Sequence, residues 1–284
     1  MKLLSVLFFL FLQTSIFAKP TIVVSILPQK TFVDKIAQGM AEVTVMVPQG
    51  ASPHSYEPKV SQMVALSKAD IYFSIGVEFE EAWLDKFKSQ NKTLKFIDMN
   101  AGIEKIEMVE HHHEHEHEHQ HDHDEMDPHV WTSPSNVAVM AQTIYISLTE
   151  LDPKHQQFYK KNLLNFLEEI NKTDLEIKEI FKDTKPDTSF MVFHPSWGYF
   201  AKEYHLKQVS VEVEGKSPKP KEMINIIEEA KEEDVKVIFT QPEFSDKSAQ
   251  TIAKETGVIV KKISPLNPQW SQNLIQMARA IADK

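Results

Sequence analysis

The stretch DPKHQQFYKKNLLNFLEEINKTDLEIKEIFK, residues 152–182, decides how the rest of the chain can fold. Its apolar residues recur at helical spacing, which is typical of a helix with one buried face. They are Phe158, Leu163, Leu164, Phe166, Leu167, Ile170, Leu175, Ile177, Ile180 and Phe181. Asp152 followed by Pro153 gives a capping acid and a proline at the first helical position. A helix of about 30 residues would be roughly 45 Å long, enough to span a molecule as a strut.

A coiled-coil dimer is the alternative use of this helix, but its heptads are irregular. On both sides of it, short β-branched or aromatic runs alternate with amphipathic stretches. Before it we expect strands at Thr21–Leu27, Val43–Val47, Ile71–Ile75 and Leu94–Ile97, and helices at Gln29–Gly39, Pro58–Lys68, Glu78–Ser89 and Pro134–Glu150. After it we expect strands at Ser189–Phe193, Lys207–Val213, Lys236–Thr240 and Val258–Ile263, and helices at Trp197–Tyr204, Pro220–Glu233, Ser245–Thr256 and Trp270–Ala282. This alternation indicates βαβ units and mostly parallel sheets.

The predicted fold class is therefore α/β, with two lobes joined by a single long helix. We expect an N-terminal lobe at residues 19–150, the linking helix at 151–185 and a C-terminal lobe at 186–284. Residues 1–18 stand apart, because Lys2 precedes an apolar run of about ten residues that is too short to span a bilayer. This pattern predicts a secretory signal peptide that ends at Ala18, with a retained N-terminal anchor as the alternative.

Composition limits the compartment and the partners. The 284 residues include no cysteine, so neither disulfides nor lipid attachment through cysteine is available. An exported chain of this kind suits a Gram-negative periplasm, and no later stretch is apolar enough to span a membrane. The formal net charge is −10 without a basic cluster, which argues against nucleic acid and makes a cation a natural partner.

Residues 110–127 form a low-complexity segment rich in histidine and acidic residues. Its histidines are His111, His112, His113, His115, His117, His119, His121 and His123. With no apolar residue before Met126 the segment is expected to be disordered, and its imidazoles are suited to zinc, copper or nickel. We predict an auxiliary, low-affinity metal-binding loop. An expression tag and a merely solvated loop are the alternatives; the internal position and the interleaved acids argue against a tag.

Three histidines outside this loop share a setting. His54 and His129 each lie just before a predicted helix, and His194 directly follows the predicted strand Ser189–Phe193. Ligands in open α/β sheets bind where such loops emerge, and three imidazoles with a fourth ligand complete a tetrahedral zinc site. Ordinary histidines near turns are the alternative, but the export signal and the histidine-rich loop favour a site. His155 and His205 lack this setting.

The chain resembles the zinc and manganese solute-binding proteins of ABC importers, specifically the zinc-uptake branch. The resemblance covers residues 19–284 and rests on Val47–Pro58, Asp127–Pro134, Val192–Phe200, residues 214–218 and Phe239–Phe244. It implies two lobes with little hinge motion, a monomer, and a zinc ion in the interlobe cleft held by His54, His129 and His194. It also implies a permease subunit in the inner membrane as the partner.

The fourth ligand departs from the family pattern. Many relatives have aspartate where this chain has Ser264, and some zinc members have glutamate where it has Pro53. A water is expected to complete the shell, with Ser264, Glu212 and Glu243 as further candidates. The predicted function is zinc capture and delivery to an ABC-type importer, not catalysis. The alternatives are a periplasmic zinc buffer or chaperone without a transporter, and a three-histidine zinc hydrolase.

Overall fold

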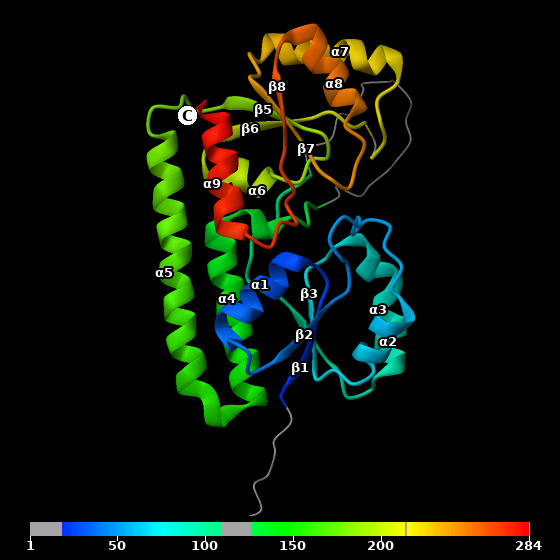
Figure 1. Ribbon diagram of the computed structural model, residues 1–284, viewed down its shortest axis with the longest axis vertical. Helices are drawn as coiled ribbons and strands as arrows, with labels where there is room; N and C mark the ends of the chain where they lie inside the picture. The colour runs from blue at the N-terminus through cyan, green and yellow to red at the C-terminus, as the bar shows by residue number, and fades with distance from the viewer. Residues whose placement is uncertain (1–18, 109–125, 214, 284) are drawn as a thin grey trace, which may run out of the picture.

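The computed structural model describes residues 19–108, 126–213 and 215–283, which form two α/β lobes beside a long helix (Figure 1). The predicted signal peptide and the eight histidines of the predicted metal-binding loop lie outside the described residues. Among the described helices, none is both long and apolar enough to cross a membrane.

The first lobe is built on a parallel four-stranded sheet in the order β2-β1-β3-β4. The strands are β1 (Thr21–Val24), β2 (Glu42–Val45), β3 (Ile71–Ser74) and β4 (Lys95–Asp98), and the helices between them are α1 (Leu27–Ala37), α2 (Val60–Leu66) and α3 (Glu78–Gln90). Strand order reverses between β1 and β3, and the crevice outside the carboxyl ends of such a strand pair is where open sheets bind ligands.

The second lobe repeats this topology with the order β6-β5-β7-β8, again all parallel. Its strands are β5 (Thr188–Val192), β6 (Leu206–Ser210), β7 (Val237–Thr240) and β8 (Ile259–Lys262), and its helices are α6 (Gly198–Glu203), α7 (Pro220–Glu232), α8 (Lys247–Thr256) and α9 (Trp270–Ile281). The predicted pair of parallel α/β lobes is confirmed. The corresponding reversal in this sheet lies between β5 and β7.

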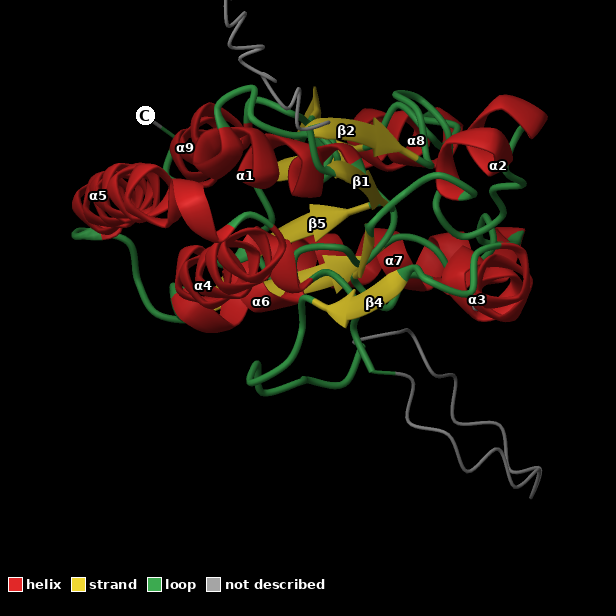
Figure 2. Ribbon diagram, turned by 90° about the horizontal axis from the view of Figure 1, so that it is seen from below, coloured by secondary structure: helices red, strands yellow, loops and turns green. Residues whose placement is uncertain are grey.

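Helices α4 (Pro134–Leu151) and α5 (Gln156–Phe181) form an antiparallel pair on one side of the molecule, with α9 beside α5 (Figure 1). Figure 2 shows α2, α3, α7 and α8 on the opposite side. Helix α5 has 26 residues, so it is about 39 Å long and links the lobes as predicted. Its apolar face packs against α1, α4 and α9 of the same chain.

The start of the long helix differs from the prediction. Pro153–His155 form a 3-10 turn, and α5 begins only at Gln156. The reason is that the Asp152 carboxylate pairs with His155 Nδ1 at 2.5 Å and accepts from the Tyr159 hydroxyl at 2.9 Å, instead of capping backbone N–H groups. Ser133 does cap α4 as the sequence indicates, since its hydroxyl accepts from the Asn136 N–H.

Several other predicted elements are shorter than expected. Strand β1 ends at Val24 rather than Leu27, because α1 already begins at Leu27. Helix α2 begins at Val60 rather than Pro58, because Lys59 is extended and its N–H donates to the Gln62 side chain. Strand β6 ends at Ser210 rather than Val213. Beyond it the Glu212 N–H donates to the Phe193 carbonyl at 3.0 Å, which turns the chain over the end of β5.

The hydrophobic core is continuous from one lobe to the other. Phe190 and Val192 face this shared core, whereas Met191 and Phe193 face a smaller cluster under α7 and α8. This division follows from the alternation of side chains along a strand. One face of the second sheet therefore packs against the same apolar body as the first lobe.

The indole N–H groups of two buried tryptophans join the lobes by hydrogen bonds. The indole N–H of Trp131 donates to the Pro265 carbonyl at 2.8 Å, and that of Trp270 donates to the Trp131 carbonyl at 2.7 Å. Phe32 of α1 packs edge-on against Trp270, with ring centroids 5.6 Å apart. These contacts connect α1, the segment before α4 and the start of α9.

Replacing Trp270 with phenylalanine should lower the free energy of unfolding by about 1–3 kcal/mol, since it removes a buried hydrogen bond and leaves a cavity. Urea denaturation measures the change. The matched control is Leu164→Ala on the outer face of α5, where the leucine is 58% exposed and the loss should stay within about 0.5 kcal/mol. Equal losses in the two variants would contradict the junction described here.

Candidate metal centre

His54 lies in the loop between β2 and α2 and is the most open of the three histidines, with its side chain 25% exposed. The start of α3 holds this loop in place. The Phe79 N–H donates to the Pro53 carbonyl at 3.2 Å, and the Glu78 carboxylate lies 2.6 Å from His54 Nδ1. The first turn of α3 thus fixes both the backbone and the ring of the His54 segment.

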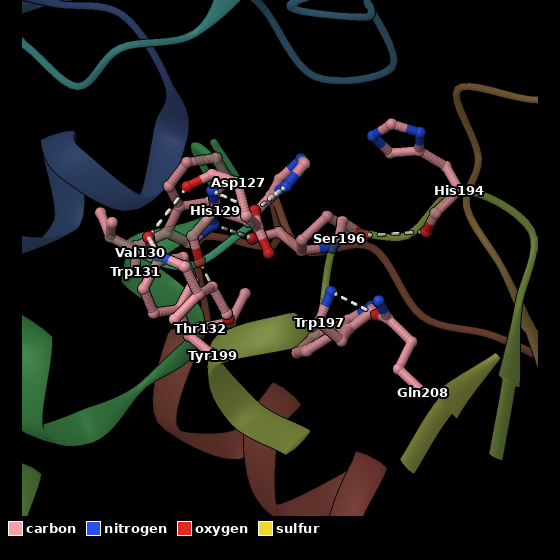
Figure 3. Close-up of polar contacts among 12 residues, drawn as sticks. Asp127, His129, Val130, Trp131, Thr132, His194, Ser196, Trp197, Tyr199 and Gln208 are labelled. Carbon is pink, nitrogen blue, oxygen red and sulfur yellow. Dashed lines mark hydrogen bonds and ion pairs between the residues drawn. The ribbon is translucent and has the colours of Figure 1, made fainter. Parts of the chain in front are cut away.

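His129 precedes the 3-10 turn Val130–Thr132 and is buried. Asp127 lies two residues earlier, and one of its oxygens accepts from the His129 backbone N–H at 2.8 Å and lies 2.7 Å from its Nδ1 (Figure 3). A Cβ atom on Gly198, the first residue of α6, would come within 2.6 Å of Asp127 Oδ2. The close approach of α6 to Asp127 therefore requires glycine at this position.

His194 follows β5 and is also buried. The Gln241 side chain, after β7, holds its backbone, donating to the His194 carbonyl at 2.9 Å and accepting from its N–H at 3.4 Å. The ring of Phe244 stacks on the imidazole at a centroid distance of 5.2 Å and an interplanar angle of 26°. The loops after β5 and β7 are thereby joined at the reversal point of the second sheet.

The three imidazoles converge between the lobes. One ring nitrogen from each lies within 4.8 Å of the others, and among the described residues no other group of His, Asp or Glu side chains is so arranged. The ring centroids of His54 and His129 lie 4.4 and 5.2 Å from that of His194. His155 and His205 lie elsewhere, beside Asp152 and in the turn between α6 and β6.

Each imidazole has a carboxylate at Nδ1, from Glu78, Asp127 and Glu212 respectively. Such a partner accepts a hydrogen bond from the Nδ1–H group and leaves the Nε2 lone pair facing outward, which is how proteins orient histidine ligands. His194 Nε2 is buried and has no hydrogen-bond partner among the described residues. A nitrogen with an unused lone pair in this position suits a metal ion.

Two of these groups, Glu78 and His194, have pKa values shifted from their ordinary values. Burial acts to raise the pKa of Glu78, but the hydrogen bond and charge of His54 outweigh it and hold that pKa at about 2. Burial lowers the pKa of His194, and its Glu212 partner opposes the shift only in part. His194 is therefore neutral, as a metal ligand must be, to a lower pH than an ordinary histidine.

Glu80, also on the first turn of α3, fixes this turn to the sheet. Its buried carboxylate accepts from the backbone N–H groups of Ile75 and Gly76 and from the Ser25 hydroxyl, at the carboxyl ends of β3 and β1. Burial raises the pKa of Glu80 to about 7, although these hydrogen bonds lower it. The position of Glu78 beside His54 depends on this attachment.

The three histidines His54, His129 and His194 are called the triad below. The sequence did not identify Glu78 or Asp127 as partners of the triad, and it offered Glu212 only as a candidate ligand. Some signal was present. Asp127 lies two residues before His129 in Asp-Pro-His, and Glu78 begins a helix just after a strand. Neither pattern shows which imidazole each carboxylate contacts.

A cavity of about 590 Å³ reaches His54 and His194, and Met108 also lines it. Glu243 lines both this cavity and a neighbouring cavity of about 460 Å³, which Ser264 also lines. The Ser264 hydroxyl donates to the Glu243 carboxylate at 3.1 Å. Burial raises the pKa of that carboxyl group.

Two parallel α/β lobes with three imidazoles between them define a metal-binding protein of the solute-binding class. A model of the family described as zinc-uptake complex component A, periplasmic, matches residues 22–284, and the chain belongs to this family. It is thus the metal-binding component of an ABC-type uptake system, and this family is one of transport proteins rather than enzymes.

Relatives of known name agree on metal transport but differ in the metal. The chain is 31% identical over 251 residues to the high-affinity zinc uptake system protein ZnuA of Bacillus subtilis, covering 86% of this chain and 78% of that protein. It is 28% identical to the iron-binding protein YfeA of Yersinia pestis, over 80% and 72% of the two chains. A crystal structure of ZnuA superimposes with a TM-score of 0.84 at 40% identity, over 94% and 99% of the two chains.

Glu78→Gln and Glu212→Gln should each weaken metal binding by about 10- to 100-fold, because the imidazole loses the charged group that orients it and raises its basicity. Competition with a chromophoric chelator measures the affinity. Glu233→Gln is the matched control, since Glu233 pairs with Ser189 and Lys207 away from the triad. A loss of the same size in the control would show that the effect does not come through the imidazoles.

Proposed function

We propose that this protein captures zinc in the periplasm through His54, His129 and His194 and delivers it to the permease of an ABC-type importer. The observation that carries the proposal is the convergence of three imidazoles, each with a carboxylate at Nδ1. Zinc is the substrate of this binding step, and the only bonds that form or break are those between the ion and its ligands.

Zinc is favoured over manganese by the chemistry of the donors. Imidazole nitrogens bind zinc at about 2.0–2.1 Å in four-coordinate sites, whereas manganese prefers carboxylate, carbonyl and water oxygens. The nitrogen donors of this site come from both lobes and are largely buried, so a bound ion loses most of its water. The name of the Bacillus subtilis relative supports the same metal.

The compartment is inferred from the sequence together with the family. Residues 1–18 have the pattern of a secretory signal, the chain contains no cysteine for lipid attachment, and the family description includes the periplasm. Export through such a signal would place the triad where external zinc arrives. The permease subunit in the inner membrane is then the natural recipient.

Replacing His54, His129 or His194 with alanine should weaken zinc binding by at least about tenfold, because one of the three protein ligands is lost. His155→Ala and His205→Ala are the matched controls and should leave the tight site intact. Calorimetry gives the affinities. A strain lacking the gene should grow poorly in zinc-depleted medium and should be rescued by the control variants but not by the triad variants.

Normal growth of the deletion strain in that medium would contradict delivery to an importer and would favour a zinc buffer. Full affinity in all three triad variants would contradict the site itself.

Zinc affinity should fall steeply below about pH 6, because an imidazole must be neutral to bind metal and its ordinary pKa is about 6.5. Burial lowers the pKa of His194, so protonation of this ring begins at a lower pH than usual and delays the loss. Calorimetry at pH 7.5 and 5.5 in buffers of different ionisation enthalpy measures affinity and proton uptake. Equal affinities at the two pH values would count against histidine ligation.

A further inference from the structure

We propose that Glu243 is the fourth metal ligand and that Ser264 holds its carboxylate aside until a cation arrives. This inference rests on the proposed capture of metal by the triad and adds to it the residue that closes the coordination shell. Three neutral imidazoles supply no negative charge to a divalent ion, and a carboxylate oxygen is an ordinary fourth ligand for zinc.

The backbone of Glu243 is anchored beside the triad. The side-chain amide of Gln241, two residues earlier, makes two hydrogen bonds to the His194 backbone, and Phe244, the next residue, stacks on the His194 ring. The Phe244 ring also lies 6.3 Å from that of His54. Residue 243 is therefore held at the carboxyl end of β7, beside two of the three histidines.

Glu243 is the carboxylate that remains available in the cavity lined by His54 and His194. Among the described residues, Glu78, Glu212 and Glu243 are the acidic residues that line this cavity. Glu78 and Glu212 already hold imidazoles at 2.6 and 2.7 Å, so moving either one would release a ligand. Glu243 can leave its position without this cost.

Ser264 holds the Glu243 side chain in place by hydrogen bonds. Its hydroxyl donates to the two carboxylate oxygens at 3.1 and 3.4 Å and accepts from the Leu266 N–H at 3.1 Å, which fixes it in the loop after β8. The Glu243 carboxylate is half-buried and has no cationic partner among the described residues. One hydroxyl therefore balances its charge only in part. A divalent cation at the triad would attract it more strongly than this hydroxyl does.

The movement required is a rotation of one side chain. The triad nitrogens lie within 4.8 Å of one another, and the Glu243 carboxylate accepts from the Ser264 hydroxyl at 3.1 Å. Glu243 lines the same cavity as His54 and His194, so the proposal requires its side chain to turn toward these imidazoles within that cavity.

The test compares Glu243→Gln with Ser264→Ala in the full-length mature protein, with zinc affinity measured by chelator competition. Glu243→Gln should weaken zinc binding by about tenfold or more, since an anionic ligand is lost. Ser264→Ala should bind zinc no more weakly than the unmodified protein, because it removes only the hydrogen bond that holds the carboxylate aside. Glu233→Gln, in the same lobe but outside the cavity, should leave affinity unchanged.

Cobalt(II) substituted for zinc gives a second readout that a structural defect would not mimic. If water replaces the lost carboxylate in Glu243→Gln, the visible spectrum should change with pH near neutrality as that water ionises, as zinc-bound water does near pH 7. The unmodified protein should show no such transition.

Unchanged affinity and an unchanged cobalt spectrum in Glu243→Gln, with the triad alanine variants still defective, would overturn this inference and leave the proposed function standing. A cobalt spectral transition near neutral pH in the unmodified protein, with the cobalt still bound on both sides of it, would also overturn the inference, because it would show bound water. Full zinc affinity in the triad alanine variants would instead contradict the proposed function.

Discussion

The indole hydrogen bonds of Trp131 and Trp270 set the relation between the lobes, and the convergence of the three imidazoles depends on that relation. The three imidazoles come from the first lobe, the segment before α4 and the second lobe, and no single element holds two of them. Trp131 is two residues from His129, and its indole bonds to the carbonyl of Pro265 in the second lobe. A change in this junction would alter the spacing of all three rings.

The shared core makes such a change costly. Rotating one lobe against the other would break both indole hydrogen bonds and separate Phe32 from Trp270. It would also expose apolar surface that now lies in one continuous core, at about 25 cal/mol per Å². Helix α5 adds resistance, because it packs against α1 in the first lobe and α9 in the second. Side chains and loops at the cavity can therefore rearrange at a lower cost than the lobes can.

The sequence predicted the elements and the three histidines because their signals are local. Strand and helix periodicities lie within a few residues, and each histidine sits at a strand or helix end. The carboxylates that orient the rings could be assigned only from the folded chain. Glu78 meets His54, and Glu212 meets His194, through contacts between separate loops. The start of α5 was missed for a related reason, since the Asp152 side chain bonds to His155 and Tyr159 rather than to the backbone.

The same carboxylates bear on how strongly the site attracts a cation. Each imidazole has a carboxylate at Nδ1, so the other ring nitrogen is left for an approaching ion and the carboxylate lies on the opposite side of the ring. Charges placed this way attract an approaching divalent ion without binding it directly. They also raise the basicity of the rings, which strengthens coordination but makes protons better competitors. Burial of His194 offsets this second effect by lowering its pKa. This burial keeps the His194 ring neutral to a lower pH than an ordinary histidine.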